Sequence, residues 1–318
     1  MNVKQNLMLI VSIVLCLAVY PFYDIAIGII IMLTATTAVV TLLGSSGKGL
    51  VPVVISAAGA LIFYFAFGTE YIIPGVLTAV AAMAGFVMGI SIKGKWALQG
   101  ILLFSGGVFL AAIMAAVFVI NKVYDVDLIN LIIKSLKETA YNTMLAFGMV
   151  TSGDVAETKN MVEIAYSYMT TLVPSVLILT CAGMAYTSFG IARYILKKCG
   201  IILPTIPDRR HLIMSRGSGW IMILVWVLNM MIENERIGYA LSNISVIIST
   251  FFLICGISLV LHLIEYKVKP AGIKWLLRLV VFTSLFSVGS MLITEIYVMA
   301  AIIDSVWNFR KIGPAIHQ

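Results

Sequence analysis

Long apolar runs separated by short polar gaps constrain this chain more than any other feature of its sequence. A helix needs about 20 predominantly apolar residues to cross the hydrocarbon of a bilayer. Runs near that length cover residues 6–20, 25–43, 50–67, 72–92, 97–121, 161–195, 217–232, 240–264, 273–288 and 290–306. Charged residues make up 11% of the chain, against about 25% in soluble domains. The sequence therefore predicts an all-α, polytopic transmembrane helix bundle of about ten spans, within a range of about eight to ten.

The last two runs admit two interpretations. Residues 273–306 form either one long tilted helix or a hairpin that turns near Val288-Gly289-Ser290. One long helix would place Arg310 and Lys311 on the outer side, whereas a hairpin keeps them on the inner side with most other cations. We therefore favour the hairpin.

Lysine and arginine are sorted between the two sides of such a bundle. If the N-terminus is inside, 16 of the 21 cations lie on the inner side, and ten of the 14 acids lie on the outer side. Cytoplasmic loops of inner-membrane proteins are enriched in Lys and Arg in this way. The sequence predicts a single integral membrane domain over residues 1–318, in the bacterial cytoplasmic (inner) membrane, with both termini in the cytoplasm.

The net charge of +7 does not indicate nucleic acid, because the cations flank apolar spans, where they set topology and contact lipid headgroups. The densest group lies around the basic cytoplasmic loop 196–216. We expect anionic lipids of the bilayer as its partners, with an acidic protein as the alternative. No metal or other cofactor is predicted, because the four cysteines match no metal-site spacing; they are Cys16, Cys181, Cys199 and Cys255.

The outer segment 121–160 contains an amphipathic helix. Its apolar positions recur at helical spacing, and Asp125 or Asp127 provides the N-cap. This helix either lies in the headgroup region on the outer side of the cytoplasmic membrane or covers an outward-facing cavity. A second helix is expected to begin at Asp154 and to run as far as Lys198; at this length it either projects into water at the outer side or bends at Pro174.

A face of small residues marks the span 72–92. Ala81, Gly85 and Gly89 recur every four residues, and such a pattern lets two helix backbones approach closely. The face serves either internal packing or the docking of a membrane protein subunit.

Residues that could carry chemistry are few. The chain has no zincin, nucleophile-elbow, Walker or dinucleotide-binding motif, so we predict a protein that is not an enzyme. Ionisable residues inside a membrane are functional candidates, and Glu295 is the clearest of them. Asn229 and Asn243 flank the same outer loop and are candidates for lining a ligand cavity with Glu295, or for hydrogen bonding between helices.

Three stretches resemble the YybS-type family of bacterial multi-pass membrane proteins. They are "IIPGVLTAVAAMAGFVMGISIKGK", "LSNISVIISTFFLICGISLVLHLI" and the C-terminal "AIIDSVWNFRK", in which Asp304, Phe309 and Arg310 match the family's closing motif. That family is distantly similar to the substrate-binding S components of ECF transporters and to the rod-shape protein MreD. The resemblance implies either a bundle that binds a small ligand or a scaffold.

Three functions follow as hypotheses. The protein binds or translocates a small solute at an outward-facing cavity, as an S component would. Alternatively, it is a non-catalytic scaffold of envelope machinery, or an enzyme that acts on a lipid-linked substrate. A polar cavity that reaches Glu295 would favour transport, a sealed apolar interior would favour the scaffold, and acids and histidines clustered at one depth would favour the enzyme.

Overall fold

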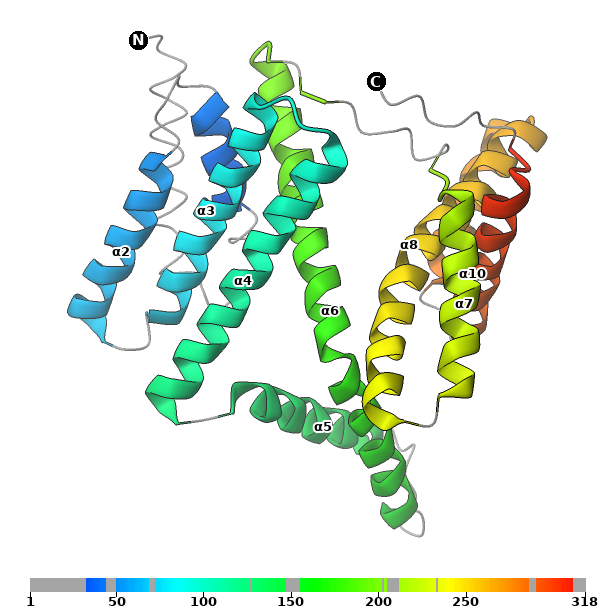
Figure 1. Cartoon of the computed structure of the whole chain (residues 1–318), viewed down its shortest axis with the longest axis horizontal. Coiled ribbons are helices and arrows are strands. Elements are labelled where there is room, and N and C mark those ends of the chain that lie inside the picture. The colour runs from blue at the N-terminus through cyan, green and yellow to red at the C-terminus, as the bar shows by residue number, and fades with distance from the viewer. Residues whose placement is uncertain are drawn as a thin grey trace. The chain divides into compact units, whose positions relative to one another are not determined.

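The computed structural model describes residues 33–43, 50–68, 72–125, 127–146, 155–201, 203–204, 212–232, 234–285 and 290–310. Within these ranges the chain forms helices and turns and no strand, which confirms the all-α prediction for the part described. The first predicted span, residues 6–20, lies outside the described residues. In chain order the helices are Leu33–Leu43, α2 (Val51–Phe67), α3 (Ile72–Lys93), α4 (Leu98–Tyr124), α5 (Leu128–Ala146), α6 (Val155–Lys198), α7 (Arg216–Met231), α8 (Glu235–Lys267), α9 (Ala271–Ser284) and α10 (Ser290–Trp307) (Figure 1).

The chain folds as two compact units. Unit 1 comprises Met1–Thr170 and Val176–Thr205, and unit 2 comprises Thr171–Ser175 and Ile206–Gln318. One turn of α6, around Pro174, therefore belongs with α7–α10 in unit 2. The single membrane domain expected over residues 1–318 stays a prediction.

Several helices have the length and apolar composition of membrane spans. Among the described residues, the four that satisfy both requirements are Gly75–Lys93, Leu98–Lys122, Met169–Lys198 and Glu235–Lys267. Other helices are shorter: the 16 residues of α7 extend over about 24 Å and the 14 of α9 over about 21 Å, against a hydrocarbon thickness of about 30 Å. The structure thus supports a membrane protein with several apolar helices, while about ten spans and the cytoplasmic placement of both termini stay predictions.

In unit 1, α3 packs between α2 and α4, and its small-residue face meets the helix Leu33–Leu43 (Figure 1). Ala81, Gly85 and Gly89 are all buried. A Cβ atom built on Gly85 would collide with the backbone carbonyl of Ala35, and one on Gly89 would lie 2.5 Å from Leu42 Cδ2. A helix of the same chain therefore packs closely against this face at Gly85 and Gly89.

In unit 2, α7, α8 and α10 pack around a buried apolar cluster that contains Met222, Phe252 and Val298. Glycines again permit close approach: a Cβ on Gly219 would lie 2.5 Å from Ser305 Oγ on α10, and one on Gly256 would collide with the backbone carbonyl of another α10 residue. These contacts allow three helix backbones to approach where lipid provides no hydrophobic force between helices.

Residues 273–306 form two helices and not one. α9 ends at Ser284 and α10 begins at Ser290, and Ser284 Oγ lies 3.1 Å from Tyr297 Oη. This agrees with the hairpin interpretation and not with one long tilted helix.

The amphipathic helix α5 follows the end of α4 and runs toward the first part of α6 in unit 1 (Figure 1). Asp125, with φ of 50°, ends α4 in the left-handed conformation. Asp127 Oδ1 accepts a hydrogen bond from the backbone N–H of Asn130 at 3.2 Å and caps α5. Of the two cap candidates, Asp127 therefore begins α5 and Asp125 terminates the helix before it.

Helix α6 is continuous over 44 residues and contains Pro174, which confirms the prediction of one long helix. At about 1.5 Å per residue it extends roughly 66 Å, about twice the hydrocarbon thickness. Its candidate span begins at Met169, so the stretch from Val155 to Tyr168 precedes the apolar part. The predicted start at Asp154 lies outside the described residues.

Candidate functional site

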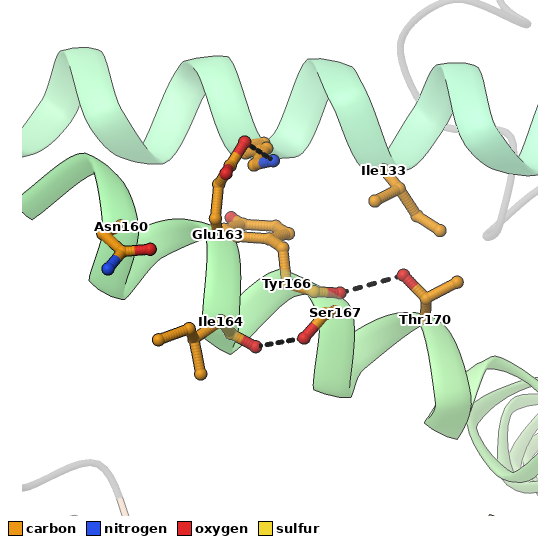
Figure 2. A pocket seen from close by; sticks show the side chains of 8 residues that line it. Ile133, Asn160, Glu163, Ile164, Tyr166, Ser167 and Thr170 are labelled. Carbon is orange, nitrogen blue, oxygen red and sulfur yellow. Dashed lines mark hydrogen bonds and ion pairs between the residues drawn. The ribbon is translucent and has the colours of Figure 1, made fainter.

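A groove lies between α5 and the first part of α6 in unit 1 (Figure 2). Its volume is about 440 Å³. It is lined by Ile133 and Lys137 of α5 and by Asn160, Glu163, Ile164, Tyr166, Ser167 and Thr170 of α6. Isoleucine side chains thus contribute apolar surface, while a cation, an anion, an amide and hydroxyl groups contribute polar surface.

An ion pair joins the two sides of the groove. Lys137 Nζ donates to Glu163 Oε1 at 2.8 Å, and the two side chains are 33% and 58% exposed (Figure 2). Ion pairs with this exposure contribute little net stability, about 0–1 kcal/mol, because water screens them. Exchange of this ion pair for other contacts therefore costs the protein little stability.

The other polar groups of the groove differ in how they are occupied. Ser167 Oγ donates to the Ile164 carbonyl at 2.7 Å, and Thr170 Oγ1 donates to the Tyr166 carbonyl at 2.9 Å. These hydroxyl protons are therefore used within α6. The Asn160 amide has no hydrogen-bond partner among the described residues, so it can donate to and accept from a ligand.

The groove lies at the polar end of a candidate membrane span. Its α6 residues lie between Asn160 and Thr170, around the start of the apolar segment Met169–Lys198. Its α5 residues come from the helix that lies across the bundle, which is the orientation expected for an interfacial helix (Figure 1).

The residues that the sequence suggested for a ligand cavity do not line this groove. Glu295 is exposed on α10, and Asn229 is exposed on α7 with its Oδ1 3.5 Å from Ser242 Oγ. Lys137 and Glu163 were missed because they lie 26 positions apart on separate helices, and no local spacing relates them. The sequence showed only that Lys137 in the outer segment and Glu163 in the helix that follows carry opposite charges.

Asn243 has a structural role at the proline of α6. Its Nδ2 donates to the Thr171 carbonyl at 2.6 Å, and its Oδ1 accepts from the Ser175 N–H at 3.0 Å. In an uninterrupted α-helix these two backbone groups would bond to each other, because the N–H of residue i bonds to the carbonyl of residue i−4. The carboxamide therefore satisfies both groups beside Pro174, where the helix lacks a backbone donor.

The C-terminal motif forms a buried ion pair within unit 2. Asn308, with φ of 48°, ends α10 in the left-handed conformation and turns the chain back. Arg310 then reaches Asp304: its Nε lies 2.8 Å and its Nη2 2.7 Å from Asp304 Oδ2. Phe309, the third residue of the motif, is 62% exposed. The motif thus joins Asp304 to Arg310 and leaves Phe309 on the surface.

Arg310 also connects two other segments to α10. Its Nη1 donates to Ser258 Oγ of α8 at 2.9 Å, and its Nη2 donates to the Leu212 carbonyl ahead of α7 at 2.8 Å. The exposed fractions of the Arg310 and Asp304 side chains are only 1% and 0%, and Asp304 Oδ1 is buried without a hydrogen-bond partner. Removing one member of such a pair leaves an uncompensated buried charge, which costs about 3–5 kcal/mol.

Apolar helices of spanning length, close glycine packing and buried polar connections together define an integral membrane protein built as a helix bundle. The chain belongs to the family described as "Predicted membrane protein (DUF2232)", whose model matches residues 8–305. The match therefore includes both sides of the groove and Asp304. No curated protein and no solved structure matches the chain.

Proposed function

We propose that this protein binds a small solute at the membrane surface, in the groove between α5 and α6. The observation that carries the proposal is the groove itself. Its volume of about 440 Å³ lies in the range of small-molecule sites, roughly 300–1,000 Å³. Six of its eight lining residues carry polar groups and two are isoleucines, so the groove suits a polar solute.

The sequence predicts on which side of the membrane the groove lies. The sorting of Lys and Arg supports a bacterial cytoplasmic membrane with the groove on the outer side. The likeness to YybS-type proteins, and through them to S components, agrees with binding of a solute from outside. In this proposal the site is the α5–α6 groove and not the cavity around Glu295 that the sequence suggested.

Native mass spectrometry of the full-length protein, purified from its membrane, tests the proposal. We expect a co-purified small molecule that is retained by the wild type and lost from Ile133→Trp, because the indole would fill the groove. Ile132→Trp is the matched control, since Ile132 is exposed on the same helix and does not line the groove. Absence of an adduct from the wild type, or its retention by Ile133→Trp, would overturn the proposal.

The scaffold alternative has an observation of its own. The described interior of unit 2 contains an apolar cluster formed by α7, α8 and α10 and the buried Arg310–Asp304 pair, and Glu295 lies exposed outside both. A bundle filled in this way favours an MreD-like scaffold over a polar path through unit 2. Co-purification of a stoichiometric membrane partner, unaffected by Ile133→Trp, would support this alternative.

A further inference from the structure

We propose that the ligand of the α5–α6 groove is a zwitterion, with a primary ammonium and an anionic oxygen group a few ångströms apart. This inference rests on the proposed function of the groove and specifies its ligand class. Its basis is the placement of one cation and one anion on opposite sides of the same small groove, with their charged atoms 2.8 Å apart.

A ligand with one charge gains little from this arrangement. An anion that pairs with Lys137 takes the place of Glu163 and lies beside its repelling carboxylate, and a cation at Glu163 meets the same problem with Lys137. A zwitterion inserted between them replaces one ion pair by two. Charge-assisted hydrogen bonds are the strong class of hydrogen bond, so the exchange favours the ligand.

The exposure of the pair makes this exchange inexpensive. The side chains of Lys137 and Glu163 are 33% and 58% exposed, so water already screens their attraction. A ligand that enters the groove displaces some of this water. The charges are then surrounded by the ligand and by the Ile133 and Ile164 side chains that line the groove. Lower local polarity strengthens the new ion pairs relative to the old one.

Neighbouring groups suit the two ends of such a ligand. Tyr166 follows Glu163 by about one turn of α6, which places its ring beside the carboxylate, and aromatic faces attract ammonium groups. The Asn160 amide lines the same groove and has no hydrogen-bond partner among the described residues. It can donate to the anionic group that Lys137 holds.

This chemistry occurs both in free amino acids and in the phosphoethanolamine headgroup of a lipid. Titration calorimetry of the full-length protein distinguishes these two sources. The protein is placed in nanodiscs of phosphatidylglycerol, a lipid whose headgroup has no ammonium. The zwitterionic probes are glycine, serine and phosphoethanolamine. Ethanolamine carries the ammonium alone, and lactate carries the carboxylate alone.

We expect at least one zwitterion to bind more tightly than both singly charged probes. Binding of glycine or serine identifies a free amino acid, and binding of phosphoethanolamine alone identifies a lipid headgroup; either result supports the zwitterion class. Equal binding of ethanolamine or lactate, or no binding of any zwitterion, would overturn it.

Charge-neutral variants locate the binding. Lys137→Gln and Glu163→Gln should each raise the Kd at least about tenfold, because each removes one charge-assisted contact. Lys134→Gln and Glu138→Gln are matched controls, since both residues are exposed on α5 and neither lines the groove. Unchanged melting curves establish that the variants fold, and equal Kd values for the groove and control variants would refute the assignment.

The two proposals fail in distinguishable ways. An adduct that Ile133→Trp abolishes, but that is not a zwitterion, leaves the proposed function standing and overturns the ligand class. Loss of the groove-dependent adduct altogether overturns both.

Discussion

Arg310 Nη2 lies 2.7 Å from Asp304 Oδ2, with both side chains almost completely buried among α8, α10 and the segment ahead of α7. The sequence had grouped Arg310 with the cytoplasmic cations that set topology. In the structure it is instead the point at which the C-terminal turn, α8 and the residues before α7 are joined. Burial of this kind makes both residues sensitive to replacement.

Arg310→Ala should lower the free energy of unfolding by about 3–5 kcal/mol, because it leaves the Asp304 carboxylate buried without its counter-ion. Arg310→Met combined with Asp304→Leu should cost much less than the two single changes added together. Urea unfolding in detergent measures each value. Arg236→Ala, at an exposed position on α8, should change it by less than about 0.5 kcal/mol. Additive costs in the double variant would contradict the pairing.

Gly85→Ala should be destabilising, because the added methyl group would collide with the Ala35 carbonyl and separate α3 from the helix Leu33–Leu43. Overpacking of this kind costs about 1–3 kcal/mol. Gly107→Ala is the control: apart from its own stretch of α4, no described atom lies within 4 Å of the added Cβ, so alanine should be neutral or stabilise α4. Melting temperatures in detergent compare the two variants. Equal melting temperatures would mean that the helix Leu33–Leu43 does not pack closely against Gly85.

Asn243→Ala should destabilise the protein by about 1–3 kcal/mol, since it leaves the Thr171 carbonyl and the Ser175 N–H without their side-chain partner. The cost should be smaller in a Pro174→Ala background, because a regular helix pairs these two groups directly. Asn229→Ala is the matched control, with one long contact of 3.5 Å. A thermal unfolding cycle over the four Asn243 and Pro174 variants measures the coupling, and zero coupling would refute the bridge.

The predicted topology is tested by cysteine labelling in a cysteine-free background. Lys134→Cys and Glu235→Cys should react with an impermeant maleimide added to intact spheroplasts, because the sorting of charges places both outside. Lys95→Cys and Lys269→Cys should react only after lysis. Labelling of position 269 from outside would invert the predicted topology of unit 2 and overturn the placement of the C-terminus in the cytoplasm.

The sequence by itself determined the fold class, the membrane setting and most helix boundaries. Apolar runs and their polar gaps are local properties, so α2, α3, α6 and the break between α9 and α10 could be read from composition and length. The small-residue face of α3 was equally local, because its four-residue spacing lies within one helix. Its covering by Leu33–Leu43 was not, because any helix of the bundle could have met it.

Only the tertiary structure decided which polar residues meet. Lys137 meets Glu163 across 26 positions, Asn243 meets Thr171 across 72, and Arg310 meets Ser258 across 52. Such pairs depend on how helices pack, and no periodicity in the chain encodes a partner on another helix. The sequence therefore identified Asn243 as a candidate polar residue and Arg310 as a cation of the C-terminal motif, while packing determined that Asn243 bridges a turn of α6 and that Arg310 neutralises a buried acid.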